Sequence, residues 1–204
     1  MLLWIYALFC FFVPCIIWQV QVIVRQKKKG GLPRQKEKFI CHMILSFVFL
    51  FYLFLAAWYV AGMGTIWDLF GYGKIEGPVN LIPFSQSEGP LTYVLNIIMF
   101  LPLGFLLPLI WEDYQKLRKT TTMGFGFSLA IELCQLFCLR TTDIDDLLMN
   151  TLGSVIGYGI WRCFLRVFPK AGKQSMHLGS NEPVWYLILG MGGIFFLYNW
   201  RLFY

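Results

Sequence analysis

Apolar residues fill six long stretches of this chain, and short polar or glycine-rich segments separate them. The stretches cover residues 2–24, 39–61, 93–111, 121–139, about 142–168, and 184–200. About 20 apolar residues in a helix cross a hydrocarbon core roughly 30 Å thick. The pattern therefore predicts an all-α integral membrane protein, a polytopic bundle of about six transmembrane helices.

The composition supports a membrane class and excludes an ordinary soluble domain. The chain is 58% hydrophobic and only 14% charged, whereas soluble domains carry about 25% charged residues. Residues 2–24 lack the basic leader and small-residue cleavage site of a signal peptide, so we interpret them as a retained transmembrane helix.

Cysteine and histidine give no metal or cofactor signal. All six cysteines lie in or beside apolar stretches, where a free thiol behaves as a small packing residue. His42 and His177 each adjoin a basic loop. We therefore expect neither a metal nor a cofactor.

Basic residues alternate between the polar segments and predict the topology. The segments after the first, third and fifth stretches, together with Arg162 and Arg166 near the end of the fifth stretch, hold 14 of the 17 Lys and Arg residues, with seven of them in residues 25–38. Cytoplasmic loops carry such an excess. The bias predicts a multi-pass protein of the bacterial cytoplasmic membrane with both termini extracytoplasmic. The basic run is too short, and too confined between two spans, to indicate nucleic-acid binding.

Cysteine labelling tests this topology. A cysteine introduced at Thr141 should react with a membrane-impermeant maleimide in intact cells, and one introduced at Lys173 should not, because the two positions are expected on opposite sides of the membrane. The reverse labelling pattern would overturn the assignment.

Residues 62–92 form an outer loop that is unusually apolar. The loop is either re-entrant or interfacial, with Trp67, Tyr72 and Phe84 as aromatic anchors, or it is a structured external loop. Asn80 is suited to closing an Asx-type turn ahead of Pro83.

The third and fourth helices each carry polar groups at membrane depth. Asn96 lies in the third, where Pro102 and Pro108 free backbone carbonyls and predict a kink. Glu132 and Gln135 share a face of the fourth. An intramembrane carboxylate is costly, at roughly 2.5 kcal/mol or more, and such groups usually face a cavity or a partner.

Residues 140–157 combine three carboxylates with a hydrophobic helix, for which Thr142 is the expected N-cap. At 100° per residue, one stripe about 80° wide collects a set of carboxylate, amide and glycine positions, and Asp145 points to the opposite side. The stripe contains Asp143, Asp146, Asn150, Gly153 and Gly157. It predicts a polar entrance that leads into a close helix-packing groove.

Two interpretations of these polar groups remain open. In the first they are structural: Arg140 pairs with Asp143 or Glu132, the aspartates complement the helix N-terminus, and the amides bond across the bundle. In the second they form a ligand pocket at the outer leaflet, in which Glu132, Asp143 and Asp146 are also the candidate acids and bases for catalysis. The predicted ligand-binding residues are Asn80, Phe84, Asn96, Glu132, Gln135, Arg140, Asp143, Asp146 and Asn150.

Four ordered blocks give the chain a resemblance to the VanZ-like family of bacterial membrane proteins. They are NLIPF at 80–84, NIIMFLPLG at 96–104, ELCQ at 132–135, and RTTDIDD at 140–146 followed by NTLG at 150–153 and Gly157. On this basis residues 79–160 form a VanZ-like core, residues 1–78 an N-terminal transmembrane pair with its loops, and residues 161–204 a C-terminal loop and last helix.

The resemblance implies an influence on susceptibility to teicoplanin-type lipoglycopeptides. Our leading hypothesis is that the outer pocket binds an amphiphile, either a lipid-linked wall precursor or the acylated drug. The alternatives are a membrane enzyme that modifies a lipid or glycolipid headgroup by carboxylate acid and base chemistry, and a structural partner of the cell-wall machinery. The expected partners are membrane lipids together with one of these amphiphiles.

Overall fold

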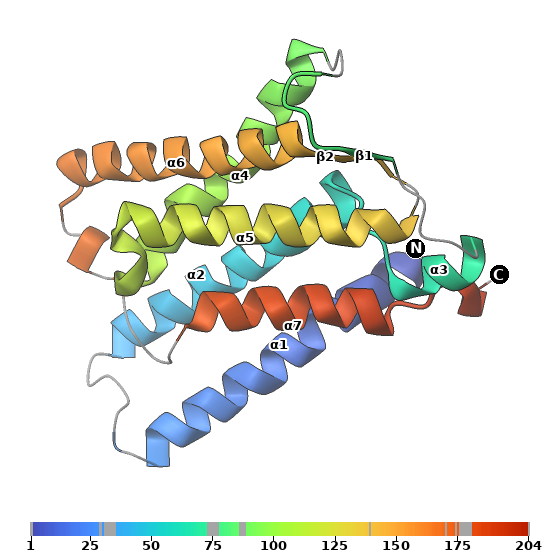
Figure 1. Ribbon diagram of the computed structural model, residues 1–204. Coiled ribbons are helices and arrows are strands. Elements are labelled where there is room, and N and C mark those ends of the chain that lie inside the picture. Colours follow the sequence, from blue (N-terminus) through green and yellow to red (C-terminus); the bar gives the residue numbers. More distant parts are fainter. Residues whose placement is uncertain are drawn as a thin grey trace.

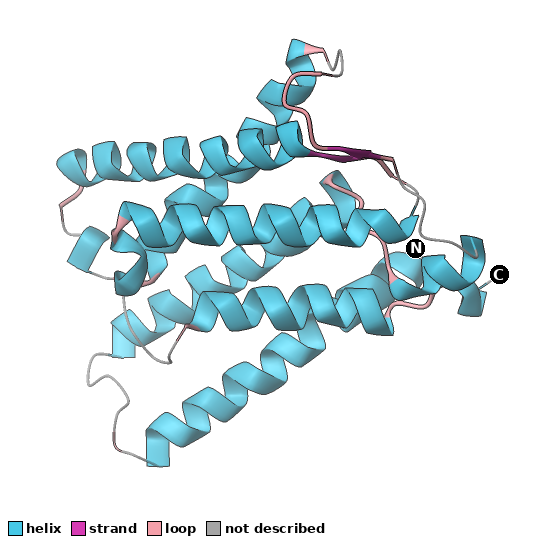
Figure 2. Cartoon of the chain, in the orientation of Figure 1, coloured by secondary structure: helices cyan, strands magenta, loops and turns pink. Residues whose placement is uncertain are grey.

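The computed structural model describes residues 2–28, 30, 36–72, 78–85, 89–138, 140–169, 171–173, 175 and 181–203. The α-helices are α1 (Leu2–Lys28), α2 (Lys36–Phe54), α3 (Ile66–Tyr72), α4 (Pro90–Ile110), α5 (Leu117–Gln135), α6 (Ile144–Val167) and α7 (Glu182–Leu197). Short helical segments of other types are η1 (Leu55–Val60), η2 (Glu112–Gln115), η3 (Leu136–Cys138), η4 (Ala171–Lys173) and η5 (Trp200–Phe203). The two short strands are β1 (Val79–Asn80) and β2 (Thr142–Asp143). This confirms the predicted all-α class (Figures 1 and 2).

Four described helical segments are long and apolar enough to cross a membrane. They are Leu2–Lys28, Lys36–Val60, Pro90–Ile110 and Leu117–Cys138. Helix α7 is apolar but has only 16 residues, and α6 contains Asp145, Asp146, Arg162 and Arg166. The protein is therefore a membrane protein, and the total of six spans stays a prediction.

Several elements that are far apart in the sequence gather at one end of the bundle. Both termini, α3 and the β1–β2 pair lie together there (Figure 1). The two strands pair in parallel, with Val79 opposite Thr142 and Asn80 opposite Asp143. This bridge, which the sequence did not predict, ties the loop before α4 to the start of α6. The Tyr72 side chain lies outside the described residues, and whether the loop is re-entrant stays a prediction.

Glycines of α6 allow α4 to pack against its backbone. A Cβ atom added at Gly153 would overlap the Ile97 carbonyl oxygen, and one added at Gly157 would overlap the Leu101 carbonyl oxygen. Small residues at such crossings let two helix backbones approach closely in a membrane. The predicted packing groove is confirmed, and α4 is the helix that fills it. Helix α4 itself is continuous across Pro102 and Pro108.

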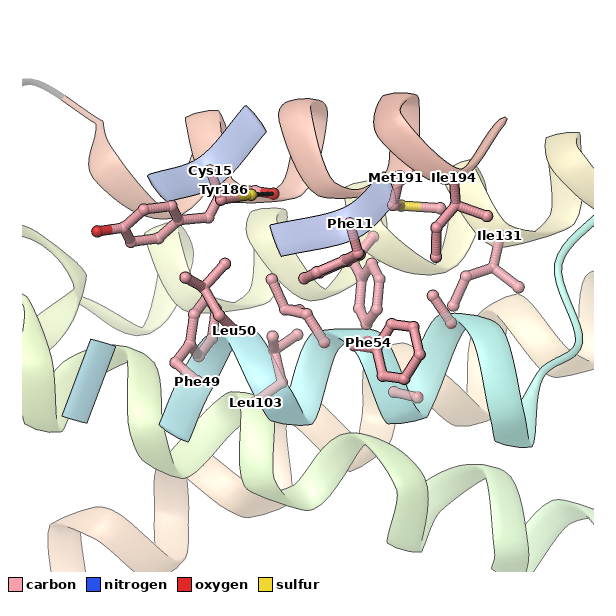
Figure 3. Packing of buried hydrophobic residues seen from close by; sticks show 14 of the residues in the cluster. Phe11, Cys15, Phe49, Leu50, Phe54, Leu103, Ile131, Tyr186, Met191 and Ile194 are labelled. Atoms are coloured by element: carbon pink, nitrogen blue, oxygen red, sulfur yellow. Dashed lines mark hydrogen bonds between the residues drawn. The ribbon is translucent and has the colours of Figure 1, made fainter. Parts of the chain in front are cut away.

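Aromatic side chains dominate the core between α1, α2, α4 and α7. Phe11 meets Phe54 edge to face with ring centroids 5.5 Å apart, and Phe49 meets Trp111 in the same way at 5.0 Å. Figure 3 shows these phenylalanines packed with Leu103 and Met191. Edge-to-face contacts stabilise aromatic pairs by about 0.5–1.5 kcal/mol beyond area burial. Cys10 and Cys15 are buried in this core as expected.

Candidate functional site

The loop before α4 forms a tight turn around Asn80. The buried Asn80 side chain accepts hydrogen bonds through Oδ1 from the Ile82 amide at 3.2 Å and from the Ser85 hydroxyl at 2.8 Å. This confirms the predicted Asx-type turn. Phe84 completes it with φ of 58°, a left-handed conformation that is uncommon for a bulky residue and has to be held by its surroundings.

Two carboxylates hold this turn in place. Asn80 Nδ2 donates to Asp143 Oδ2 at 3.0 Å. The Phe84 amide lies 3.0 and 3.1 Å from the two oxygens of Asp145, and the Tyr93 hydroxyl donates to Oδ2 of the same residue at 3.0 Å. Asp143 is 2% exposed and Asp145 is fully buried. The strained turn is therefore fixed by charge-assisted hydrogen bonds, which are stronger than neutral ones.

Asp143 also begins helix α6. Its backbone is extended at φ −122° and ψ 132°, and its side chain accepts from the Asp145 amide at 2.9 Å. The expected N-cap at Thr142 is therefore wrong, because the helix begins one residue later and the side chain that caps its first turn belongs to Asp143. The Asp143 amide donates to Glu132 Oε2 at 3.1 Å, which places the buried Glu132 against the same residue.

Two further contacts link the predicted stripe to its neighbours. Asn96 Nδ2 donates to Asp146 Oδ1 between α4 and α6. Asn150 Nδ2 donates to the Ser128 hydroxyl at 2.9 Å between α6 and α5. The structure thus brings these predicted site residues together across three helices, and their polar groups bond across the bundle as the structural interpretation expects.

Gln135 and Arg140 meet at a different point of the same end. Gln135 Nε2 and Arg140 Nη1 both donate to the Ala61 carbonyl, at 2.8 and 2.7 Å. The Arg140 guanidinium occupies the space that a side chain at Gly62 would fill, and Gly62 has φ of 59°. Both the lack of space and the left-handed backbone conformation therefore favour glycine at this position. The structural interpretation paired Arg140 with Asp143 or Glu132, whereas the hydrogen bond that the structure gives Arg140 goes to the Ala61 carbonyl.

Glu132, Asp143, Asp145 and Asp146 form what we call the acidic cluster. Their carboxylates accept hydrogen bonds from amides and hydroxyls at the bundle end. Among the residues that the structure describes, no three His, Cys, Asp or Glu side chains are arranged to hold a metal ion. Four cavities along the described residues are lined by other side chains, and an open pocket at the cluster stays a prediction.

The turn that the acidic cluster holds presents apolar side chains to the outside. Leu81 and Ile82 are each 69% exposed, and Phe84 is 64% exposed. We call these three residues the apolar tip. Phe84 also meets Tyr93 edge to face, with ring centroids 6.1 Å apart. The arrangement places an apolar surface directly beside buried carboxylates, which suits contact with a molecule that has both an apolar and a polar part.

Sequence reasoning left out Asp145 and Tyr93, which the structure adds to the site. A helical projection puts Asp145 on the opposite side of α6 from the glycine stripe, and in the structure the 80–85 turn and Tyr93 both contact its carboxylate. Three features of the sequence mark Asp145: it is a carboxylate in an apolar chain, it lies next to a turn motif, and it stands at the start of a helix. The missing information was which segment folds over it.

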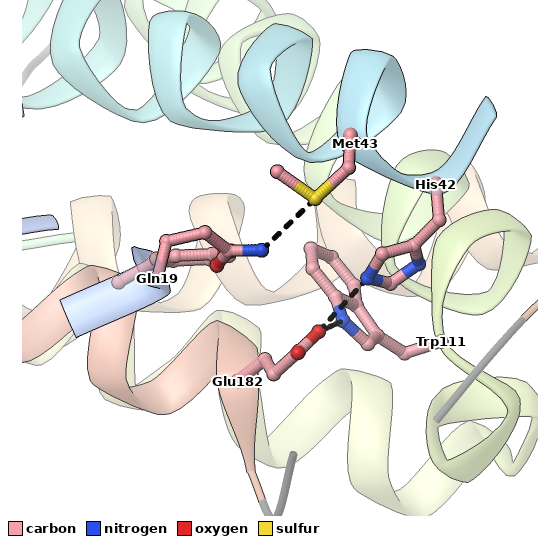
Figure 4. A network of polar contacts seen from close by, with 6 residues as sticks. Gln19, His42, Met43, Trp111 and Glu182 are labelled. Atoms are coloured by element: carbon pink, nitrogen blue, oxygen red, sulfur yellow. Dashed lines mark hydrogen bonds and ion pairs between the residues drawn. The ribbon is translucent and has the colours of Figure 1, made fainter. Parts of the chain in front are cut away.

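A second buried polar network, which the sequence did not predict, lies toward the opposite end of the bundle. His42 Nε2 lies 3.0 Å from Glu182 Oε2, and Trp111 Nε1 donates to the same oxygen at 2.6 Å (Figure 4). Glu182 is fully buried and His42 is 2% exposed. Nothing in the sequence indicated that His42 would be buried, and His177 lies outside the described residues.

Comparison with known proteins identifies relatives over the same region. A family model described as VanZ/LLP1 matches residues 39–166. The matched region includes the predicted core at 79–160 and extends beyond it, and the boundaries at 78 and 160 stay predictions. No solved structure matches the chain.

Two curated proteins are similar to part of the chain. Protein VanZ of Enterococcus faecium is 30% identical over 98 residues, which are 48% of this chain and 59% of that protein. The uncharacterized membrane protein YwnJ of Bacillus subtilis strain 168 is 26% identical over 97 residues, 48% of this chain and 66% of that protein. The alignments thus span less than two thirds of either relative.

Proposed function

This chain belongs to the VanZ/LLP1 family, and from that premise we propose that it lowers bacterial susceptibility to teicoplanin-type lipoglycopeptides. We place its action at the outer face of the cytoplasmic membrane, where it binds an amphiphile. The amphiphile is a lipid-linked wall precursor or the acylated drug itself, and binding lowers productive engagement between the two.

The observation that carries this proposal is the apolar tip held over the acidic cluster. Buried polar groups of Asn80, Asp143 and Asp145 fix the turn, and the side chains of Leu81, Ile82 and Phe84 project outward. A chain that only needed to close a loop would gain stability by burying these side chains, at about 1.5 kcal/mol or more each. Rigid exposed apolar residues reduce the ordering cost of binding.

The chemistry around the tip matches both halves of such a ligand. The tip would contact an acyl or polyprenyl chain, and the half-buried carboxylate of Asp146 would accept a hydrogen bond from a hydroxyl or amine group of the polar half. Arg140, exposed at the same end of the bundle, is suited to a phosphate. A net negative cluster would favour a ligand that carries amines.

The test is antibiotic susceptibility in a sensitive host that expresses variants at matched membrane levels. The wild type should raise the minimal inhibitory concentration of teicoplanin more than that of vancomycin. The double variant Leu81→Ser/Ile82→Ser should lose most of this protection, because losing two apolar contacts weakens binding by about tenfold or more. Its matched control is Leu202→Ser, which changes a residue of η5 that is 71% exposed.

Each outcome separates the three classes of function. Loss of protection in the tip variant and in Asp146→Asn, with the control unaffected, supports amphiphile binding. Conversion of one species into another in lipid extracts of expressing cells would indicate the enzyme instead. Equal protection by all variants would place function elsewhere on the protein, as expected for a structural partner.

A further inference from the structure

A cavity lies at the end of the bundle opposite the acidic cluster. It has a volume of about 660 Å³ and opens between the first turns of α5 and α7. Ligand sites typically enclose roughly 300–1,000 Å³. The 19-residue helix α5 separates it from Glu132, so the cavity is distinct from the site described above.

One wall of this cavity is basic. Lys116, Arg118 and Lys119 line it, and all three side chains are exposed at its mouth. Asp113 pairs with Lys119 at 3.1 Å, and both side chains are largely accessible, at 40% and 47%. That pairing offsets one positive charge, and Lys116 and Arg118 contribute two further positive charges to the lining.

Tyr114 adds a hydrogen-bond donor inside the cavity. Its side chain lines the wall and is only 6% exposed, and its hydroxyl has no hydrogen-bond partner among the described residues. Burial, together with the neighbouring Asp113 carboxylate, raises the pKa of Tyr114 to about 12. The phenol therefore keeps its proton at neutral pH and can donate it to an acceptor oxygen.

The remaining wall is apolar and continues along the helices. Met123 and Gly126 of α5 face Val184 and Leu187 of α7 across it. A Cβ atom added at Gly126 would meet nothing within 4 Å, so the space beside this glycine is open. A free phosphate would use only the basic wall, whereas a lipid would use both walls.

We propose that this cavity binds the headgroup of an anionic phospholipid, with the phosphate between Lys116, Arg118 and Tyr114 and an acyl chain along Gly126 and Leu187. On the predicted topology the cavity lies on the cytoplasmic side, at the level of the lipid headgroups. Basic pockets between transmembrane helices on that side suit anionic headgroups, and each Lys or Arg near such a surface contributes about 1 kcal/mol. The site is independent of the outer-face function proposed above.

Lipid titration of the purified full chain tests the proposal. Native mass spectrometry in detergent would give apparent dissociation constants for short-chain phosphatidylglycerol, for phosphatidylcholine with the same chains, and for inorganic phosphate. Phosphatidylglycerol should bind at least about tenfold more tightly than the other two. Equal binding of the two lipids, or binding of phosphate as tight as that of phosphatidylglycerol, would overturn it.

Two pairs of variants locate the site. Lys116→Gln/Arg118→Gln should weaken phosphatidylglycerol binding by about 30-fold, because two basic contacts are lost, whereas Arg162→Gln/Arg166→Gln on α6 removes the same charge and should not. Gly126→Leu should block the acyl path, whereas Gly192→Leu, at a glycine of α7 with equally open surroundings, should not. If a site variant and its control weaken phosphatidylglycerol binding by the same factor in either pair, the cavity is not the binding site.

Discussion

Exchanging the side chains of Asn80 and Asp143 is expected to restore stability that either single substitution removes. Asp143→Asn alone should lower the free energy of unfolding by about 1–3 kcal/mol, the cost of leaving a buried polar group without its partner. The double variant Asn80→Asp/Asp143→Asn should recover most of that loss.

The reason lies in how each oxygen of the pair is used. Asp143 accepts from the Asp145 amide through Oδ1 and from Asn80 Nδ2 through Oδ2. With Asn at position 143, the side-chain oxygen still accepts from the Asp145 amide. Its NH2 group, however, then faces the NH2 group of Asn80, so that two donors meet without an acceptor. With a carboxylate at position 80, that donor again finds an acceptor, and the Ile82 and Ser85 donors keep theirs.

Thermal unfolding in detergent measures the effect, at about 2–4 °C per kcal/mol for a chain of this size. Asp113→Asn is the matched control, because the same chemical change in an exposed ion pair should cost about 1 kcal/mol or less. Additive losses in the double variant would show that the Asn80–Asp143 hydrogen bond does not stabilise the fold.

The same double variant separates structure from function at position 143. If protection against teicoplanin requires a carboxylate at this position, the double variant should fold normally and still fail to protect. If protection returns together with stability, Asp143 acts by holding the 80–85 turn and the apolar tip.

Periodicity predicted the parts of the structure that depend on one helix at a time. The helical spacing placed Gly153 and Gly157 in a packing groove, and it placed Glu132 and Gln135 on one face of a helix, where both are buried. The Asx turn at Asn80 was also predictable, because its hydrogen bonds stay within five residues. The recognised motifs indicated the family and the bundle end at which they meet.

Contacts between distant segments were not predictable from these patterns. A helical projection gives the direction of Asp145 from the axis of α6 but not the loop that covers it. Thr142 and Asp143 are both good N-caps, and the sequence does not show that strand β2 pairs with a segment 63 residues earlier, where Asn80 contacts the Asp143 side chain. Likewise, His42 and Glu182 are 140 residues apart, and their pairing follows only from the packing of α2 against α7.

Removing His42 is expected to be among the most destabilising single changes in this protein. The Glu182 carboxylate is fully buried, and its Oε2 has two neighbouring donors, His42 Nε2 and Trp111 Nε1. His42→Ala leaves this buried carboxylate with the indole alone. Breaking a buried pair by deleting one partner typically costs about 3–5 kcal/mol, which should appear as a large fall in Tm in detergent.

A second variant distinguishes loss of the pair from loss of packing. His42→Leu/Glu182→Gln removes the charge while the amide oxygen introduced at position 182 still accepts from Trp111, so it should be clearly more stable than His42→Ala. Lys119→Ala, which breaks the exposed pair with Asp113, should cost about 1 kcal/mol or less. If the double variant is as unstable as His42→Ala, the cavity left by the imidazole, rather than the unpaired carboxylate, limits stability. If His42→Ala is no worse than Lys119→Ala, the buried network does not hold α2 and α7 together.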